Sequence, residues 1–126
     1  MKTTESAENY LETILILGMK NPHVRSIDVA EELGFKKSSV SVAMKNLREN
    51  EHIVVSHEGY ITLTESGREI ANMIFERHRV ISLALESLGV SKESAAADAC
   101  KIEHIISSES FHAIKDHVYK SLERQE

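Results

Sequence analysis

The stretch "VAEELGFKKSSVSVAMKNL", residues 29–47, decides the fold that we expect for this chain. Its first part is a short helix that ends at Gly34, the residue type found most often just past a helix C-terminus. A second helix follows over roughly Ser38–Glu49, with Val40 and Leu47 packed on its inward face. Ala30 allows the two helices to approach closely. The pattern predicts a helix-turn-helix.

The flanking segments extend this pair of helices into a winged helix-turn-helix. Residues 4–19 have the pattern of a helix, which Pro22 stops because proline disfavours helix in the residue before it. We expect Ser26 to cap the short helix. Residues 52–64, "HIVVSHEGYITLT", contain two β-rich runs and Gly59, which permits a tight turn, and so predict a β-hairpin. Helix, short helix, turn, helix and hairpin is the order of a winged helix.

The second half of the chain is predicted to be helical throughout. Thr64 caps a long helix, Ser91 caps another, and a last helix runs from about Ser108 to the end. These helices exceed what a winged helix needs, so we expect them to build a dimer. The predicted fold class is mainly α with a small β-hairpin. It comprises an N-terminal winged helix-turn-helix, residues 1–66, and a C-terminal helical dimerisation domain, residues 67–126.

Composition limits the classes of protein that fit. The 126 residues carry a formal net charge of −5, which argues against indiscriminate coating of nucleic acid. Residues 1–50 hold seven Lys/Arg and seven Asp/Glu, so the whole acidic excess falls in residues 51–126. No apolar run is long enough for a membrane span, and no signal peptide is visible. The one cysteine cannot form an internal disulfide, which favours the cytoplasm.

The start of the second helix of the pair carries the side chains expected to contact DNA. Lysines and hydroxyls there suit phosphates, because free backbone N–H groups and the helix dipole add to their donors. Val42 would offer an apolar contact to a thymine methyl group. The expected DNA-binding residues are Ser26, Lys36, Lys37, Ser38, Ser39, Ser41, Val42 and Lys45.

A single winged helix makes few contacts, so we expect a homodimer on a palindromic double-stranded DNA operator. Two alternatives stay open at this point. The helix pair could have no DNA role, and Lys36 and Lys37 could simply form a solvated loop.

A second group of chemically active residues lies in "DACKIEHIIS", residues 98–107, which contains the only cysteine. On a helix, Cys100, Glu103 and His104 share one face, because their offsets are zero, three and four. His78 lies on the preceding long helix. Each residue alone is common on a surface or in a core. Together, a thiol, a carboxylate and imidazoles are either an accident of a buried face or part of a metal site.

Five segments together resemble the metal-dependent transcriptional repressors of the diphtheria-toxin-repressor and manganese-transport-regulator family. They are "ENYLETIL", "VAEELGFKKSSVSVAMKNL", "YITLTESGREIA", "ERHRVI" and "DACKIEHIIS", and they span nearly the whole chain in the right order. The resemblance implies a cytoplasmic homodimer with an N-terminal winged helix and a helical metal-binding and dimerisation domain. It also implies that a divalent metal favours the DNA-binding form.

The resemblance implies a set of metal ligands as well. Glu12, His78, Cys100, Glu103 and His104 fall on metal-ligand positions. Asn9 falls where relatives have Asp or Met, and we include it as a weak ligand because an amide oxygen binds metal less strongly than a carboxylate does.

The chain also departs from the family pattern. Ser82 and Ala96 stand where iron-type relatives have Glu and His, so we expect their second, ancillary site to be absent or altered. The manganese type has Glu where this chain has Cys100. The chain stops at Glu126, so we expect a short form without the SH3-like domain of longer relatives.

The donor types indicate which metal to expect. A thiolate shifts preference from manganese toward Fe(II), Co(II), Ni(II) or Zn(II). With cellular availability included, we expect Fe(II) first and Mn(II) close behind, with Zn(II), Co(II) or Ni(II) binding in vitro.

Three competing functions are weighed against this one. A metal-independent winged-helix regulator would sense an organic ligand or oxidation of Cys100. An enzyme would use Cys100 as nucleophile and His104 as base, which the missing orienting group and oxyanion donors disfavour. A winged helix that binds only proteins would show no salt-sensitive DNA binding.

Overall fold

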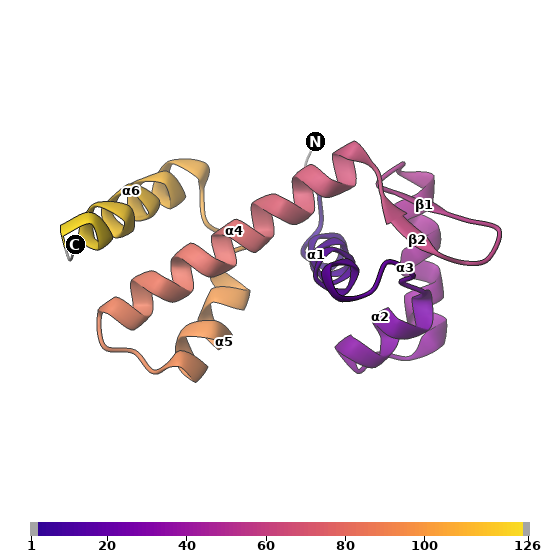
Figure 1. Cartoon of the computed structure of the whole chain (residues 1–126), viewed down its shortest axis with the longest axis horizontal. Coiled ribbons are helices and arrows are strands. Elements are labelled where there is room, and N and C mark those ends of the chain that lie inside the picture. Colours follow the sequence, from indigo (N-terminus) through magenta and orange to yellow (C-terminus); the bar gives the residue numbers. More distant parts are fainter. Residues whose placement is uncertain (1–2, 125–126) are drawn as a thin grey trace. The chain divides into compact units, whose positions relative to one another are not determined.

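The computed structural model describes residues 3–124, which form six helices and one two-stranded sheet (Figure 1). The chain divides into two compact units, residues 1–72 and 73–126. The mainly helical class with a small antiparallel hairpin is confirmed. The domain boundary at residues 66 and 67 stays a prediction. Among the described residues, no helix combines the length and apolar character that crossing a membrane requires.

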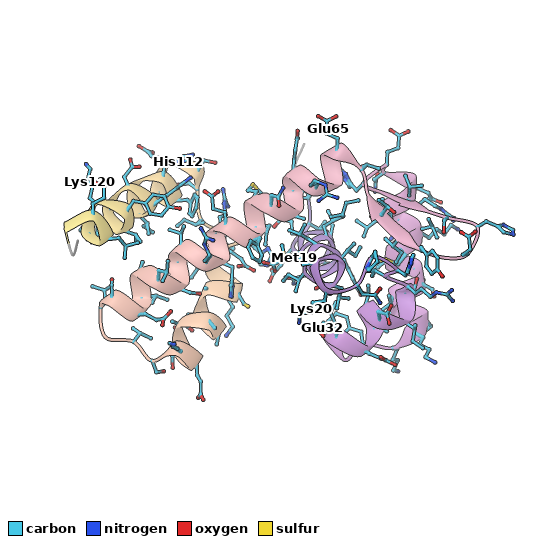
Figure 2. The ribbon with its side chains drawn as sticks, viewed as in Figure 1. Met19, Lys20, Glu32, Glu65, His112 and Lys120 are labelled. Atoms are coloured by element: carbon cyan, nitrogen blue, oxygen red, sulfur yellow. The ribbon has the colours of Figure 1, made fainter. Side chains whose placement is uncertain are left out.

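The first unit opens with α1 (Glu5–Lys20), and a favourable interaction is present at each end of this helix. The Thr4 hydroxyl accepts a hydrogen bond from the backbone N–H of Ala7 at 3.0 Å, which caps the helix. Lys20 lies in the last turn, where a positive charge interacts favourably with the helix dipole (Figure 2). The helix therefore lies within one residue of the predicted span 4–19 at each end.

Helices α2 (Ser26–Leu33) and α3 (Lys37–Glu49) form the predicted helix-turn-helix. Gly34 adopts the left-handed conformation, with φ of 69°, that the turn requires. The inward face of α3 is buried as expected at Val40, Met44 and Leu47. These contacts hold α3 with its opposite face toward solvent.

The expectation that Ser26 caps α2 is wrong. Ser26 is the first helical residue, and Arg25 precedes it in an extended conformation as the N-cap. The cap is made in the reverse direction, because the backbone N–H of Arg25 donates to the carboxylate of Asp28 at 2.9 Å. An acidic residue in the first turn thus replaces the serine hydroxyl as the capping group.

Strands β1 (Ile53–Val55) and β2 (Ile61–Leu63) form the predicted hairpin. They pair antiparallel, with Val54 opposite Thr62, and Gly59 has a φ of 87° in the turn. The N–H of Ile61 donates to the carbonyl of Val24 at 2.8 Å, so the hairpin is joined to the segment before α2. This bond fixes the wing on the helix-turn-helix.

Helix α4 (Glu65–Ser87) begins directly after the hairpin and continues into the second unit. The Thr64 hydroxyl accepts from the N–H of Gly67 at 3.2 Å, which confirms the predicted cap. Glu65, labelled in Figure 2, places a negative charge on the positive end of the helix dipole. Backbone and side chain therefore both favour the helix start at this position.

The second unit contains the rest of α4 with α5 (Lys92–Ile102) and α6 (Ser108–Arg124). The Ser91 hydroxyl accepts from the N–H of Ser94, as expected for a cap. The unit has its own apolar core, which consists of Val80, Ile81, Ala99, Phe111 and Val118. This core holds the three helices against one another.

The start of α4 leaves no room for a side chain at Gly67. A Cβ there would lie 2.0 Å from the carbonyl oxygen of His52, a backbone atom that cannot rotate away. We expect Gly67→Ala to lower the free energy of unfolding of the first unit by about 1–3 kcal/mol. Chemical denaturation followed by circular dichroism measures the change.

Gly18 provides the matched control for this prediction. It lies inside α1 with no heavy atom within 4 Å of a built Cβ. Gly18→Ala is expected to raise the free energy of unfolding by about 0.5–1 kcal/mol, because alanine favours a helix interior. Equal effects of the two substitutions would contradict the close approach of α4 to His52.

Candidate metal centre and DNA-binding surface

The second unit brings a thiol, an imidazole and a carboxylate together. His78 lies on α4, Cys100 lies on α5, and Glu103 is the C-cap residue directly after α5. The Nδ1 atom of His78 lies 3.1 Å from Oε2 of Glu103 and 3.8 Å from Sγ of Cys100. One ligand atom from each residue falls within 4.8 Å of the other two. The separation suits donors that share one cation.

His104 joins this group through the same carboxylate. Its Nε2 atom lies 3.3 Å from Oε1 of Glu103, the oxygen that faces away from the contact with His78. The carboxylate of Glu103 therefore lies between two imidazoles. We call His78, Cys100, Glu103 and His104 the donor cluster.

The prediction that one helix carries Cys100, Glu103 and His104 needs correction. Helix α5 ends at Ile102, Glu103 is its C-cap, and His104 lies in the following turn. Glu103 keeps helical dihedral angles, with φ of −57° and ψ of −26°, and its N–H donates to the carbonyl of Ala99. Cys100 and Glu103 therefore keep the expected offset, whereas the turn sets the direction of His104.

Burial of the donor cluster makes an ionised Glu103 carboxylate costly unless its charge is compensated. The side chain of Glu103 is fully buried and that of His104 is 1% exposed, whereas Cys100 is exposed. An ionised carboxylate in such a place needs positive charge or hydrogen-bond donors around it. The donor set of nitrogen, sulfur and oxygen fits a divalent transition metal, which would supply that charge.

The same burial affects His78. Desolvation lowers the pKa of His78 below its usual value of 6.5. The imidazole is therefore not positively charged at neutral pH, which is the state that a metal ligand requires.

The two remaining predicted ligands lie in the first unit. Asn9 and Glu12 are both half-buried on α1, and the backbone carbonyl of Asn9 accepts a hydrogen bond from the Thr13 hydroxyl at 2.8 Å. Their participation in the metal site stays a prediction. Ser82 lies on α4 and Ala96 on α5, and Ala96 has no side-chain donor atom to offer an ancillary site.

Sequence reasoning overlooked one residue beside the donor cluster. Arg77 shares the helical spacing of the buried residues Ile74 and Ile81, and it was therefore assigned no function. In the structure its guanidinium donates to backbone carbonyls of the turn that carries His104. The one sequence signal that could have indicated a role for Arg77 is that an arginine stands at a position where the helical spacing predicts a buried apolar residue.

The predicted DNA contacts lie on the exposed face of the helix-turn-helix. Lys36 is the N-cap of α3, and it is exposed together with the predicted contacts on that helix. These are Lys37, Ser38, Ser39, Ser41, Val42 and Lys45. Ser26 is half-buried at the start of α2. The first N–H groups of an α-helix have no acceptor within the helix, so the exposed N-terminus of α3 is suited to an anion.

A shallow depression joins these contacts to the wing. It is lined by Ser26, Ser41, Met44, Lys45, Arg48 and Val55. Arg48 was not among the predicted contacts, although its positive charge lies in the same depression as Lys45. We add Arg48 to the candidate DNA-binding surface on this basis.

Comparison with known proteins gives matches over nearly the whole chain. Residues 2–61 match the family model described as the iron-dependent repressor N-terminal DNA-binding domain. Residues 64–122 match the model described as the iron-dependent repressor metal-binding and dimerisation domain.

Individual relatives agree with these models. An uncharacterized HTH-type transcriptional regulator of Methanocaldococcus jannaschii is 36% identical over 116 residues, which cover 89% of this chain and 91% of the relative. The HTH-type transcriptional regulator MntR of Geobacillus kaustophilus is 34% identical over 113 residues, which cover 90% of this chain and 80% of the relative.

A solved structure of a manganese-dependent transcriptional repressor in complex with manganese has a TM-score of 0.80 to this chain. It is 28% identical, and the match covers 89% of this chain and 52% of that one. This chain thus spans about half the length of that repressor.

The donor cluster predicts that metal affinity depends on pH through the thiol. A cysteine binds metal as the thiolate and gives up its proton on binding, whereas burial lowers the pKa of His78 and favours its uncharged form. Because Zn(II) displaces the thiol proton of Cys100, affinity for Zn(II) should rise between pH 7 and 8, by up to about tenfold. Competition titration with a chromophoric chelator measures this slope.

Cys100→Glu is the control, because a carboxylate is already ionised over this pH range. Its affinity for Zn(II) should change little between pH 7 and 8. A variant with the slope of the natural chain would show that Cys100 is not a ligand.

Proposed function

The chain belongs to the iron-dependent repressor family, and from this premise we propose that a divalent metal bound at the donor cluster switches on operator binding. The family provides the general function. The protein is a DNA-binding transcriptional repressor that responds to divalent metal and assembles through a dimerisation domain. Its family is one of transcriptional regulators, which are not enzymes.

The buried carboxylate of Glu103 is the observation that carries the proposal. It is fully buried, lies between the imidazoles of His78 and His104, and is close to the exposed thiol of Cys100. Nitrogen, oxygen and sulfur donors at such distances are what a site for a transition metal needs. Exposed acidic groups alone would carry no such argument.

The site would be completed from the first unit. The resemblance assigns Glu12, with Asn9 as a weaker partner, to the same metal as the donor cluster. Side chains from both units holding one cation would restrict how the two DNA-binding domains of a homodimer move. The recognition helices would then reach a palindromic operator with less ordering cost.

The DNA contacts follow from the exposed face of α3. Lys36 and Lys37 would bind phosphates, and the hydroxyl groups at the start of the helix would add donors. Val42, which is 61% exposed, would contact a thymine methyl group. A DNA-binding repressor with a functional thiolate operates best in the cytoplasm, which is where we place it.

The physiological metal follows from the donor types and from the relatives. The thiolate of Cys100 favours Fe(II) over Mn(II), whereas the 28% identical repressor structure is a complex with manganese. We propose Fe(II), with Mn(II) as the second candidate, for control of iron or manganese homeostasis genes. Zn(II), Co(II) and Ni(II) would bind in vitro.

One observation favours a second candidate function. The Cys100 thiol is exposed and lies 3.8 Å from the imidazole of His78, a setting in which oxidation could replace metal as the signal. A redox sensor would change its DNA affinity on peroxide treatment even with chelator present. A metal sensor would not respond to peroxide under those conditions.

The proposal predicts the effect of removing one imidazole. With His104→Ala, addition of Mn(II) or Fe(II) should no longer increase operator affinity, because Glu103 loses its neighbour and the metal loses a ligand. The natural protein should respond about 5- to 150-fold. Fluorescence anisotropy with a palindromic promoter fragment measures the metal response of the natural protein and of the variant. Titrations with Fe(II) are done in the absence of oxygen.

The control is His117→Ala, which removes an exposed imidazole on α6 outside the donor cluster. It should leave the metal response unchanged. If His104→Ala responded to metal as strongly as His117→Ala, the assignment of His104 would be wrong.

The DNA-binding surface makes its own prediction. Lys37→Ala should weaken binding to all DNA sequences and reduce the slope of log affinity against log salt by about 1, because one phosphate contact is lost. Anisotropy at several salt concentrations with saturating Mn(II) measures this slope.

Lys120→Ala is the matched control, since it removes the same charge from an exposed position on α6 (Figure 2). Its salt slope should equal that of the natural protein. Identical slopes for both variants would remove Lys37 from the DNA interface.

A further inference from the structure

We propose that Arg77 is a positioning residue for the metal centre, which holds the turn after α5 in the conformation that metal binding requires. The inference rests on the proposed function of the donor cluster. Arg77 is not itself proposed as a metal ligand. Its guanidinium donates hydrogen bonds to backbone carbonyls of the turn.

The contacts of Arg77 span the turn from one end to the other. Nη1 donates to the carbonyl of Glu103 at 3.1 Å and to the carbonyl of Ile106 at 3.0 Å. Nη2 lies 3.5 Å from the hydroxyl of Ser108, the first residue of α6. A single side chain on α4 thereby connects the end of α5 to the start of α6.

This turn carries two of the four donors. Glu103 is the C-cap, where helical geometry ends, and His104 follows it, so the direction of the His104 side chain depends on the backbone of the turn. The N–H groups of Ile105 and Ile106 both donate to the carbonyl of Ile102, whereas the carbonyls of Glu103 and Ile106 accept from Arg77. Without the guanidinium these carbonyls would lose that partner, and the two backbone bonds to Ile102 would remain to hold the turn.

The position of Arg77 makes a purely stabilising role a poor explanation. Arg77 is 9% exposed, and its guanidinium lies over the ring of Phe111 at 5.5 Å from the centroid. Within the part of the chain that the structure describes, Nε has no hydrogen-bond partner. A buried cation is costly, and an apolar side chain of similar volume often stabilises a core better. What an apolar side chain cannot do is donate to two carbonyls at once.

The test compares three variants of the full-length protein with Co(II) as the probe. Arg77→Met keeps the volume and removes the donors. Arg77→Lys keeps a cation but loses the planar fork. Val118→Ala damages the same core from α6 without touching the turn. Near-ultraviolet thiolate-to-Co(II) absorption and visible d–d bands report affinity and coordination.

We expect Arg77→Met to weaken Co(II) binding about 10- to 100-fold and to change the visible spectrum, as loss of an orienting partner does at other metal sites. Arg77→Lys should recover part of the affinity. Val118→Ala should lower the thermal stability of the metal-free protein, yet keep natural affinity and spectrum. If Arg77→Met retained natural affinity and spectrum, or lost no more affinity than Val118→Ala, the positioning role would be refuted.

The Co(II) spectra also distinguish failure of the proposed metal site from failure of the proposed role of Arg77. Absence of a thiolate-to-Co(II) band in the natural protein would refute the proposed metal site itself. A normal band in the natural protein with no effect in the variants would refute only the role of Arg77. If Arg77→Met does not fold, Arg77→Lys decides, since severalfold weaker binding supports the role and natural affinity overturns it.

Discussion

A carboxylate that water does not reach must be compensated by its neighbours, and Glu103 is such a group. Two imidazoles flank its oxygens, and a thiol lies beside one of them. The chemistry of the second unit depends on this arrangement. Helix α4 provides His78, helix α5 provides Cys100, and the turn after α5 provides His104. A divalent cation would complete the charge balance that the carboxylate begins.

Different structural elements around Glu103 determine the spacing and the direction of the donor side chains. The apolar core of the second unit, with Val80 and Ala99 fully buried, holds α4 against α5 and so fixes how close His78 and Cys100 come. Helical dihedral angles at the end of α5 direct Glu103 inward. The turn that follows is held by backbone bonds to the carbonyl of Ile102, and the guanidinium of Arg77 adds two hydrogen bonds to its carbonyls. Packing therefore sets the spacing of the donors, and hydrogen bonds set their direction.

Most of the fold follows from local signals in the sequence. Gly34 and Gly59 adopt the positive φ values that their turns demand, and Thr64 and Ser91 cap the helices that they were expected to cap. The predicted cap at Ser26 was wrong because the Asp28 carboxylate, inside the helix, caps it instead. A single sequence does not indicate which of these two capping groups is used.

The site was only partly predictable from the sequence. The offsets of Cys100 and Glu103 hold because helical geometry persists to the C-cap, whereas the helix ends before His104 and the following turn sets the direction of that side chain. Arg77 was missed for a related reason. Its partners are backbone carbonyls far along the chain, and no pattern of side chains marks them.

The central claim is that imidazole, thiolate and carboxylate groups of the donor cluster bind one divalent cation. X-ray absorption spectroscopy of the protein loaded with one equivalent of Zn(II) tests it most directly. The account predicts one sulfur scatterer at about 2.3 Å together with nitrogen and oxygen scatterers at about 2.0–2.2 Å. The multiple-scattering pattern of imidazole should accompany them. A spectrum fitted by oxygen and nitrogen alone, with no sulfur and no imidazole signature, would contradict the claim.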